Sequence, residues 1–163
     1  MNESNEQHIE SLLDQLQGTA ETLEQESRSI PEILEGVQQR LRTLHLGLDA
    51  WVTGQPLSIQ HLSVSASTVA PRIEVQLGFA LPAPGKGGER ALVIREAAYV
   101  PDPELPADGA CKLARVLKVK LLSQAPREEQ MAALSRLPDL IGQLNAELQS
   151  RTDAIRSARK IIE

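Results

Sequence analysis

The first third of the chain places apolar residues at a seven-residue spacing, which is typical of an amphipathic helix with one apolar side. The residues at this spacing are Ile9, Leu16, Leu23, Ile30, Val37 and Leu44. Further apolar residues flank them, so the apolar side is broader than the seam of a free-standing coiled coil and should face a core or a partner. Ser29 and Glu32 resemble a capping box, and Pro31 suits the first turn of a helix. The pattern therefore predicts two helices, at about 4–27 and 30–44.

From residue 44 the apolar spacing changes from seven to two, which predicts β-strands. The alternating segments are 44–52, 59–66, 73–81, 91–99 and 111–121. Segments rich in proline or glycine separate them at 53–56, 82–90 and 101–109. Because short connections favour pairing between consecutive strands, we expect an antiparallel β-meander of four to five strands over about 45–122.

A long C-terminal helix is predicted at about 126–161, because Pro126 suits a first turn and acidic residues follow it near the positive end of the helix dipole. Pro138 should kink this helix or restart it. Helices at both ends and strands in the middle indicate an α+β fold in one domain, 1–163. Its parts are a helical arm at 1–44, a sheet at 45–122 and a helix at 123–163.

The terminal helices carry more apolar surface than one face of a small sheet can cover. The residues predicted to make this interaction surface are Ile9, Leu16, Leu23, Ile30, Val37, Leu144, Leu148 and Ile155. Residues 1–35 contain nine acids and one base (net −8), whereas residues 148–163 contain four bases and two acids (net +2), so the two ends can attract each other within or between chains. We therefore expect a non-enzymatic interaction or assembly protein that binds a protein partner or forms a homo-oligomer, with a dimer favoured.

A second hypothesis is an accessory module that binds anions or nucleic acid through its last strand. That strand carries Lys112, Arg115, Lys118 and Lys120. Lysines also protect exposed edge strands from unwanted pairing, and a net charge of −5 with one residue each of Trp, Tyr and Phe disfavours nucleic acid. Trp51 lies on the polar side of its predicted strand, where it could anchor an interface or be covered by a helix.

A third hypothesis is a small enzyme whose site combines Cys111 with His45 or His61. No catalytic motif and no metal-ligand spacing supports it, so we expect no cofactor, no metal and no small-molecule substrate. The single cysteine excludes an intramolecular disulfide and favours a reducing compartment. The polar N-terminus and the absence of a long apolar run predict a cytoplasmic protein that does not bind membranes.

Overall fold

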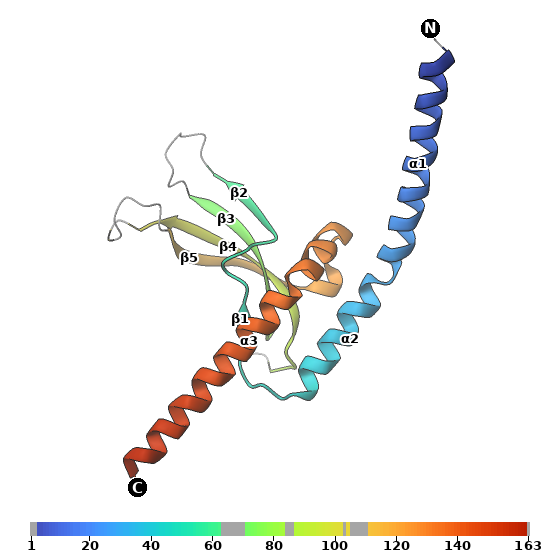
Figure 1. Cartoon of the computed structure of the whole chain (residues 1–163). Coiled ribbons are helices and arrows are strands. Elements are labelled where there is room, and N and C mark those ends of the chain that lie inside the picture. Colours follow the sequence, from blue (N-terminus) through green and yellow to red (C-terminus); the bar gives the residue numbers. More distant parts are fainter. Residues whose placement is uncertain (1–2, 63–70, 84–86, 103, 105–110, 163) are drawn as a thin grey trace.

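The computed structural model describes residues 3–62, 71–83, 87–102, 104 and 111–162. Within these residues the chain forms helices at both ends and a sheet between them (Figure 1). The elements are α1 (Glu3–Arg28), α2 (Ile30–Thr43), β1 (Ala50–Trp51), β2 (Ser58–His61), β3 (Arg72–Ala80), β4 (Ala91–Pro101), β5 (Cys111–Leu121), the 3-10 turn η1 (Leu122–Gln124) and α3 (Arg127–Ile162). The predicted α+β class is confirmed.

A bend at Ser29 separates α1 from α2. Ser29 keeps helical dihedral angles (φ −80°, ψ −11°), and its hydroxyl donates to the carbonyl of Glu26 at 2.6 Å. The predicted capping box is therefore wrong, because a capping side chain needs an extended backbone at this position. Pro31 has no N–H to donate to the carbonyl of Ser27, so the hydrogen-bond ladder is interrupted here and the helix changes direction (Figure 1).

The end of α2 is set by a residue in the left-handed region. The N–H of His45 donates to the carbonyl of Arg42 at 3.1 Å, and its φ of 49° turns the chain out of the helix. Leu48 and Val52 are then buried on either side of the two-residue β1. The sheet thus begins later than the predicted residue 45. A two-residue alternation indicates which side chains face the core, but it does not indicate which backbone groups form hydrogen bonds with an adjacent strand.

The sheet is antiparallel, with the strand order β1-β3-β4-β5. β2 also pairs with β3, so β1 and β2 share one edge of β3, and β5 forms the opposite edge of the sheet. The register places Leu77 opposite Ile94 and Gln76 opposite Arg95. Residues 63–66 of the predicted second strand and most of the predicted loop at 101–109 lie outside the described residues.

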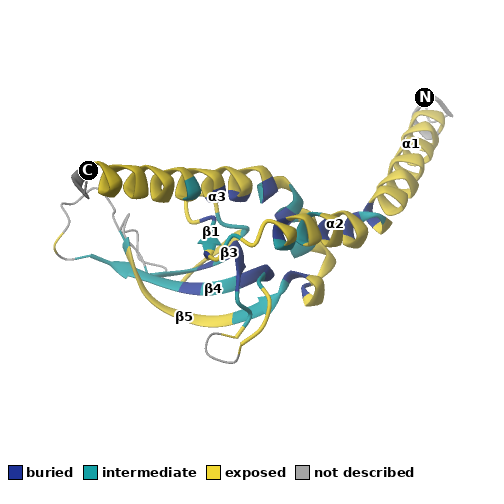
Figure 2. Ribbon diagram, turned by 90° about the horizontal axis from the view of Figure 1, so that it is seen from below, coloured by how far each residue is buried: buried dark blue, intermediate teal, exposed yellow. Residues whose placement is uncertain are grey.

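The core lies between one face of the sheet and helices α2 and α3 (Figure 2). Leu77 and Phe79 of β3 are buried there against the helices. α3 continues through Pro138 without a break, so it does not restart there, although Figure 1 shows its first turns at an angle to the long remainder. Leu137 and Leu140 are buried on either side of this proline, so both parts of the helix reach the core.

Candidate interaction surface

α1 is a helical arm that projects from the body of the protein (Figure 2). Every residue from 7 to 26 is exposed, including large apolar side chains on one side of the helix. These are Ile9, Leu12, Leu13, Leu16 and Leu23, each 50–65% exposed, and we call them the α1 stripe. Burying such a half-exposed side chain is worth about 1 kcal/mol, and contiguous exposed apolar residues mark binding surfaces.

Only the last turns of α1 hold the arm to the body. Ser27 is buried, and Arg127 of α3 donates Nη2 to the carbonyl of Glu24 at 3.2 Å. The ion pair between Arg28 and Glu24 at 2.7 Å lies within α1 and does not contact the body. No element in the part of the chain that the structure describes covers the α1 stripe.

The remaining sides of α1 are acidic. Residues Glu3–Arg28 contain seven acids and one base, a net charge of −6. At 3.6 residues per turn, Asp14 and Glu21 lie on the side away from the α1 stripe. A partner that contacts the stripe therefore meets an apolar surface on a helix whose other sides carry negatively charged side chains.

The C-terminal end of α3 is also uncovered. We call residues 149–162 the α3 tail; residues 149–160 are all exposed, and Ile155 is 58% exposed. The tail contains four bases and one acid, a net charge of +3. Arg151 and Arg156 pair with Glu147 and Asp153 on the same helix.

The predicted interaction residues divide into two groups. Ile30 and Leu144 are buried in the core, and Val37 and Leu148 pack against it, so these residues stabilise the fold. The exposed members are Ile9, Leu16, Leu23 and Ile155. The seven-residue spacing is the same in both groups, and only the position relative to the sheet distinguishes them.

The predicted anion surface on β5 is partly neutralised by acids of the same chain. Its residues are Lys112, Arg115, Lys118 and Lys120. Lys120 pairs with Glu129 of α3 at 2.9 Å, and Lys112 pairs with Asp102 at 3.3 Å. Arg115 and Lys118 are exposed on this edge strand, as expected for a protected sheet edge.

Trp51 lies on the face of the sheet opposite the helical core and packs near Ala80, Ala91 and Val93. Its indole ring crosses Gly78 so closely that a Cβ atom at residue 78 would be 2.3 Å from Trp51 Cε3. The guanidinium of Arg95 stacks on the indole, 4.3 Å from the ring centroid, and burial lowers the pKa of Arg95. Trp51 is thus held by its own chain, and its role as an interface anchor stays a prediction.

A buried polar network continues from Arg95 along the same face. Gln76 accepts a hydrogen bond from Arg95 Nε at 2.9 Å and donates to Glu74 (2.8 Å) and to the hydroxyl of Tyr99 (2.7 Å). Glu74 also accepts from Arg72 at 2.7 Å, and this hydrogen bond raises the pKa of Arg72.

The sequence pattern does not reveal this network, because Glu74 and Gln76 alternate with apolar residues as a solvated strand face does. The residue that points to contacts on this face is Gly78, since a glycine inside a regular strand often marks the close approach of another group.

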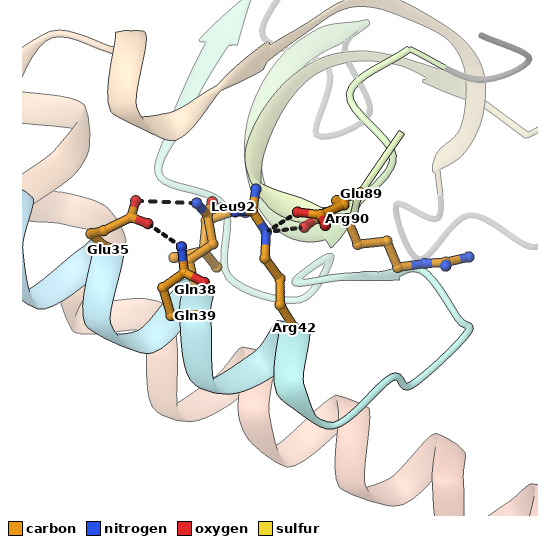
Figure 3. A network of polar contacts seen from close by, with 7 residues as sticks. All are labelled: Glu35, Gln38, Gln39, Arg42, Glu89, Arg90 and Leu92. Carbon is orange, nitrogen blue, oxygen red and sulfur yellow. Dashed lines mark hydrogen bonds and ion pairs between the residues drawn. The ribbon is translucent and has the colours of Figure 1, made fainter. Parts of the chain in front are cut away.

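A second polar network fastens α2 to β4 (Figure 3). Arg42 donates Nε to the carbonyl of Arg90 at 2.9 Å and lies 3.6 Å from Glu89. Gln38 accepts a hydrogen bond from the N–H of Leu92 at 2.9 Å. A cavity of about 280 Å³ adjoins the two arginines, whose charges already have acidic partners in the chain.

The residues of the enzyme hypothesis are not brought together. Cys111 begins β5 at one edge of the sheet, His61 lies in β2 at the opposite edge, and His45 follows α2. Among the described residues, no group of three or more His, Cys, Asp or Glu side chains could hold a metal ion.

None of the described helices combines the length and the apolar character that crossing a membrane requires. Comparisons with protein families, curated proteins and solved structures found no match to this chain. A functional proposal rests instead on the exposed surfaces described above, the α1 stripe and the α3 tail.

Proposed function

We propose that this protein is a non-enzymatic assembly protein that self-associates through α1, with a second copy of the same chain as its partner. The observation that supports this proposal is the α1 stripe: five large apolar side chains, each at least half exposed, on one side of a 26-residue helix.

The placement of the two ends of the chain favours a partner from outside the chain. Both views show α1 and the α3 tail leaving the body at opposite ends, so the two cannot contact each other within one molecule in this arrangement (Figures 1 and 2). A second copy can bring to α1 what its own chain cannot, namely an exposed helix of opposite charge. The net charges are −6 for α1 and +3 for the α3 tail.

The magnitude of the apolar contribution indicates how such an assembly would respond to mutation. Burying the two stripes of a dimer would contribute about 10 kcal/mol, at roughly 1 kcal/mol for each half-exposed side chain. Association costs about 4–15 kcal/mol in lost motion. The two amounts are similar, so one charged residue in the stripe should be enough to prevent association.

Sedimentation velocity of the full chain tests this proposal. The unmodified chain should associate at micromolar concentration, and Leu16→Glu should be monomeric because it places a charge at the centre of the stripe. Ser11→Glu is the matched control, since residue 11 is exposed on the opposite side of α1. Circular dichroism should show the same helix content in all three proteins. A monomeric unmodified chain, or association of Leu16→Glu equal to that of the unmodified chain, would refute the proposal.

The anion-binding alternative has weaker support, because acids of the same chain pair with Lys112 and Lys120. The enzyme alternative has weaker support still, since its cysteine and its strand histidine lie on opposite edges of the sheet.

A further inference from the structure

We infer that the surface that receives α1 is the α3 tail of the second copy, so that each contact joins the arm of one chain to the tail of another. This inference rests on the proposed self-association and adds the identity of the acceptor. It also gives a role to the basic end of α3, which contributes little to the core.

Charge distinguishes the three ways in which two exposed helices of this protein can pair. Pairing α1 with α1 joins two helices of net charge −6, and pairing tail with tail joins two of net charge +3. Only the pairing of α1 with the α3 tail joins opposite charges. Because like charges across an interface disfavour a complex and opposite charges steer its formation, the mixed pairing is selected.

A row of apolar residues on α3 that ends at Ile155 of the tail matches three residues of the α1 stripe in spacing and in length. Ile141, Leu148 and Ile155 follow one another at seven-residue intervals, as three residues of the α1 stripe do. At 1.5 Å per residue both sets span about 21 Å. Ile141 and Ile155 are 47% and 58% exposed, whereas Leu148 between them packs against the core, so the accessible members of this row are its two ends. Equal spacing allows the side chains of one helix to interleave with those of the other.

The contact joins two different surfaces, which limits the symmetries that the assembly can have. Such a contact either closes, as a dimer with two reciprocal arm–tail pairs or as a larger ring, or continues from chain to chain as an open filament. Consider one variant in which only the arm is intact and another in which only the tail is intact. Together they can form one arm–tail contact and no more. This property makes the inference testable without knowing the register of the helices.

The experiment compares Ile155→Glu with Leu16→Glu by sedimentation velocity and then mixes them. Each variant should be monomeric alone, and an equimolar mixture should form a heterodimer, because Ile155→Glu has an intact arm and Leu16→Glu has an intact tail. If the unmodified chain forms a dimer with two reciprocal contacts, the heterodimer has only one of them and should form at a higher protein concentration. Ser157→Glu, which adds the same side chain to another side of the tail, should associate like the unmodified chain. Association of the unmodified chain should also weaken as salt rises, because the attraction between arm and tail is screened.

Two outcomes would refute the arm–tail pairing and leave the proposed self-association through α1 standing, and a third would refute both. If Leu16→Glu is monomeric and Ile155→Glu associates normally, self-association through α1 stands and the tail is not its acceptor. If both variants are monomeric and their mixture stays monomeric even at concentrations far above those at which the unmodified chain associates, the arm–tail pairing is refuted. If the unmodified chain is monomeric, both the inference and the proposed function fail.

Discussion

Replacing Gly78 with alanine should displace Trp51 from the sheet. The added Cβ would lie 2.3 Å from Cε3 of the indole and 2.7 Å from Cδ2 and Cζ3, far inside van der Waals contact. The obstructing atoms belong to a rigid ring packed near Ala80 and Val93, so a small side-chain movement cannot relieve the overlap. Either the indole leaves its place or β1 separates from β3.

The cost follows from three contributions. Overpacking at a well-packed site costs about 1–3 kcal/mol. Loss of the stacking between Arg95 and the indole adds about 0.5–1 kcal/mol. Alanine also has less conformational freedom than glycine in the unfolded chain, and this difference stabilises the folded state by about 0.4–1 kcal/mol. The net loss in the free energy of unfolding is about 1–3 kcal/mol, which lowers the urea midpoint by about 0.5–1.5 M for a typical slope of about 2 kcal/mol per molar.

The fluorescence of Trp51 measures this effect directly, because it is the only tryptophan in the chain. Urea unfolding of Gly78→Ala should show a lower midpoint, and the emission of the native protein should shift to longer wavelength as the indole becomes hydrated. Protein concentration must be equal in all samples, since self-association would raise the apparent stability. Gly142→Ala is the matched control, because nothing lies near a Cβ there and alanine should stabilise α3 by up to about 1 kcal/mol. Unchanged emission and an unchanged midpoint in Gly78→Ala would refute the placement of the indole over Gly78.

Two further substitutions test the polar networks. Gln76→Leu removes the partner of Arg95 and one partner of the buried Glu74, so it should lower the free energy of unfolding by about 2–4 kcal/mol in urea titrations. The exposed Gln60→Leu is its control, and equal stability of the two variants would contradict a stabilising role for the network. Arg42→Ala removes the bond to the carbonyl of Arg90 and should cost about 1–2 kcal/mol in the same assay. Arg40→Ala, on the exposed side of α2, should change stability by less than about 0.5 kcal/mol, and an equally small effect of Arg42→Ala would contradict the link between α2 and β4.

The elements that the sequence predicts well are those in which burial imposes a regular period. Helices α2 and α3 bury one side, so their apolar residues recur every three to four residues, and the residues of β3 that face the helical core recur every two. The features that it predicts poorly depend on contacts with distant residues. His45 ends α2 through a left-handed backbone, and regular pairing of β1 with β3 is limited to Ala50 and Trp51, followed by one hydrogen bond from the N–H of Val52 to the carbonyl of Leu77. Neither feature changes the local apolar period.

The candidate surface shows a different limit of sequence patterns. Leu23 and Ile30 occupy equivalent positions in one seven-residue series, yet Leu23 is 55% exposed and Ile30 is 5% exposed. Their local sequences do not explain this difference, because both belong to amphipathic helices of similar character. The difference arises from the bend at Ser29, which places α2 against the sheet and directs α1 away from it.

The bend therefore determines which residues of the seven-residue apolar series are buried and which are exposed. Before Ser29 the series has no covering element among the described residues, and after it the series forms part of the core. Pro31 helps to set this division, since it removes a backbone donor at the junction and its ring excludes a straight helical path. The bent arrangement leaves about 5 kcal/mol of apolar burial unrealised on α1. An arm held in this way is suited to a partner that supplies the missing surface, which is the role proposed above for the oppositely charged tail of a second copy.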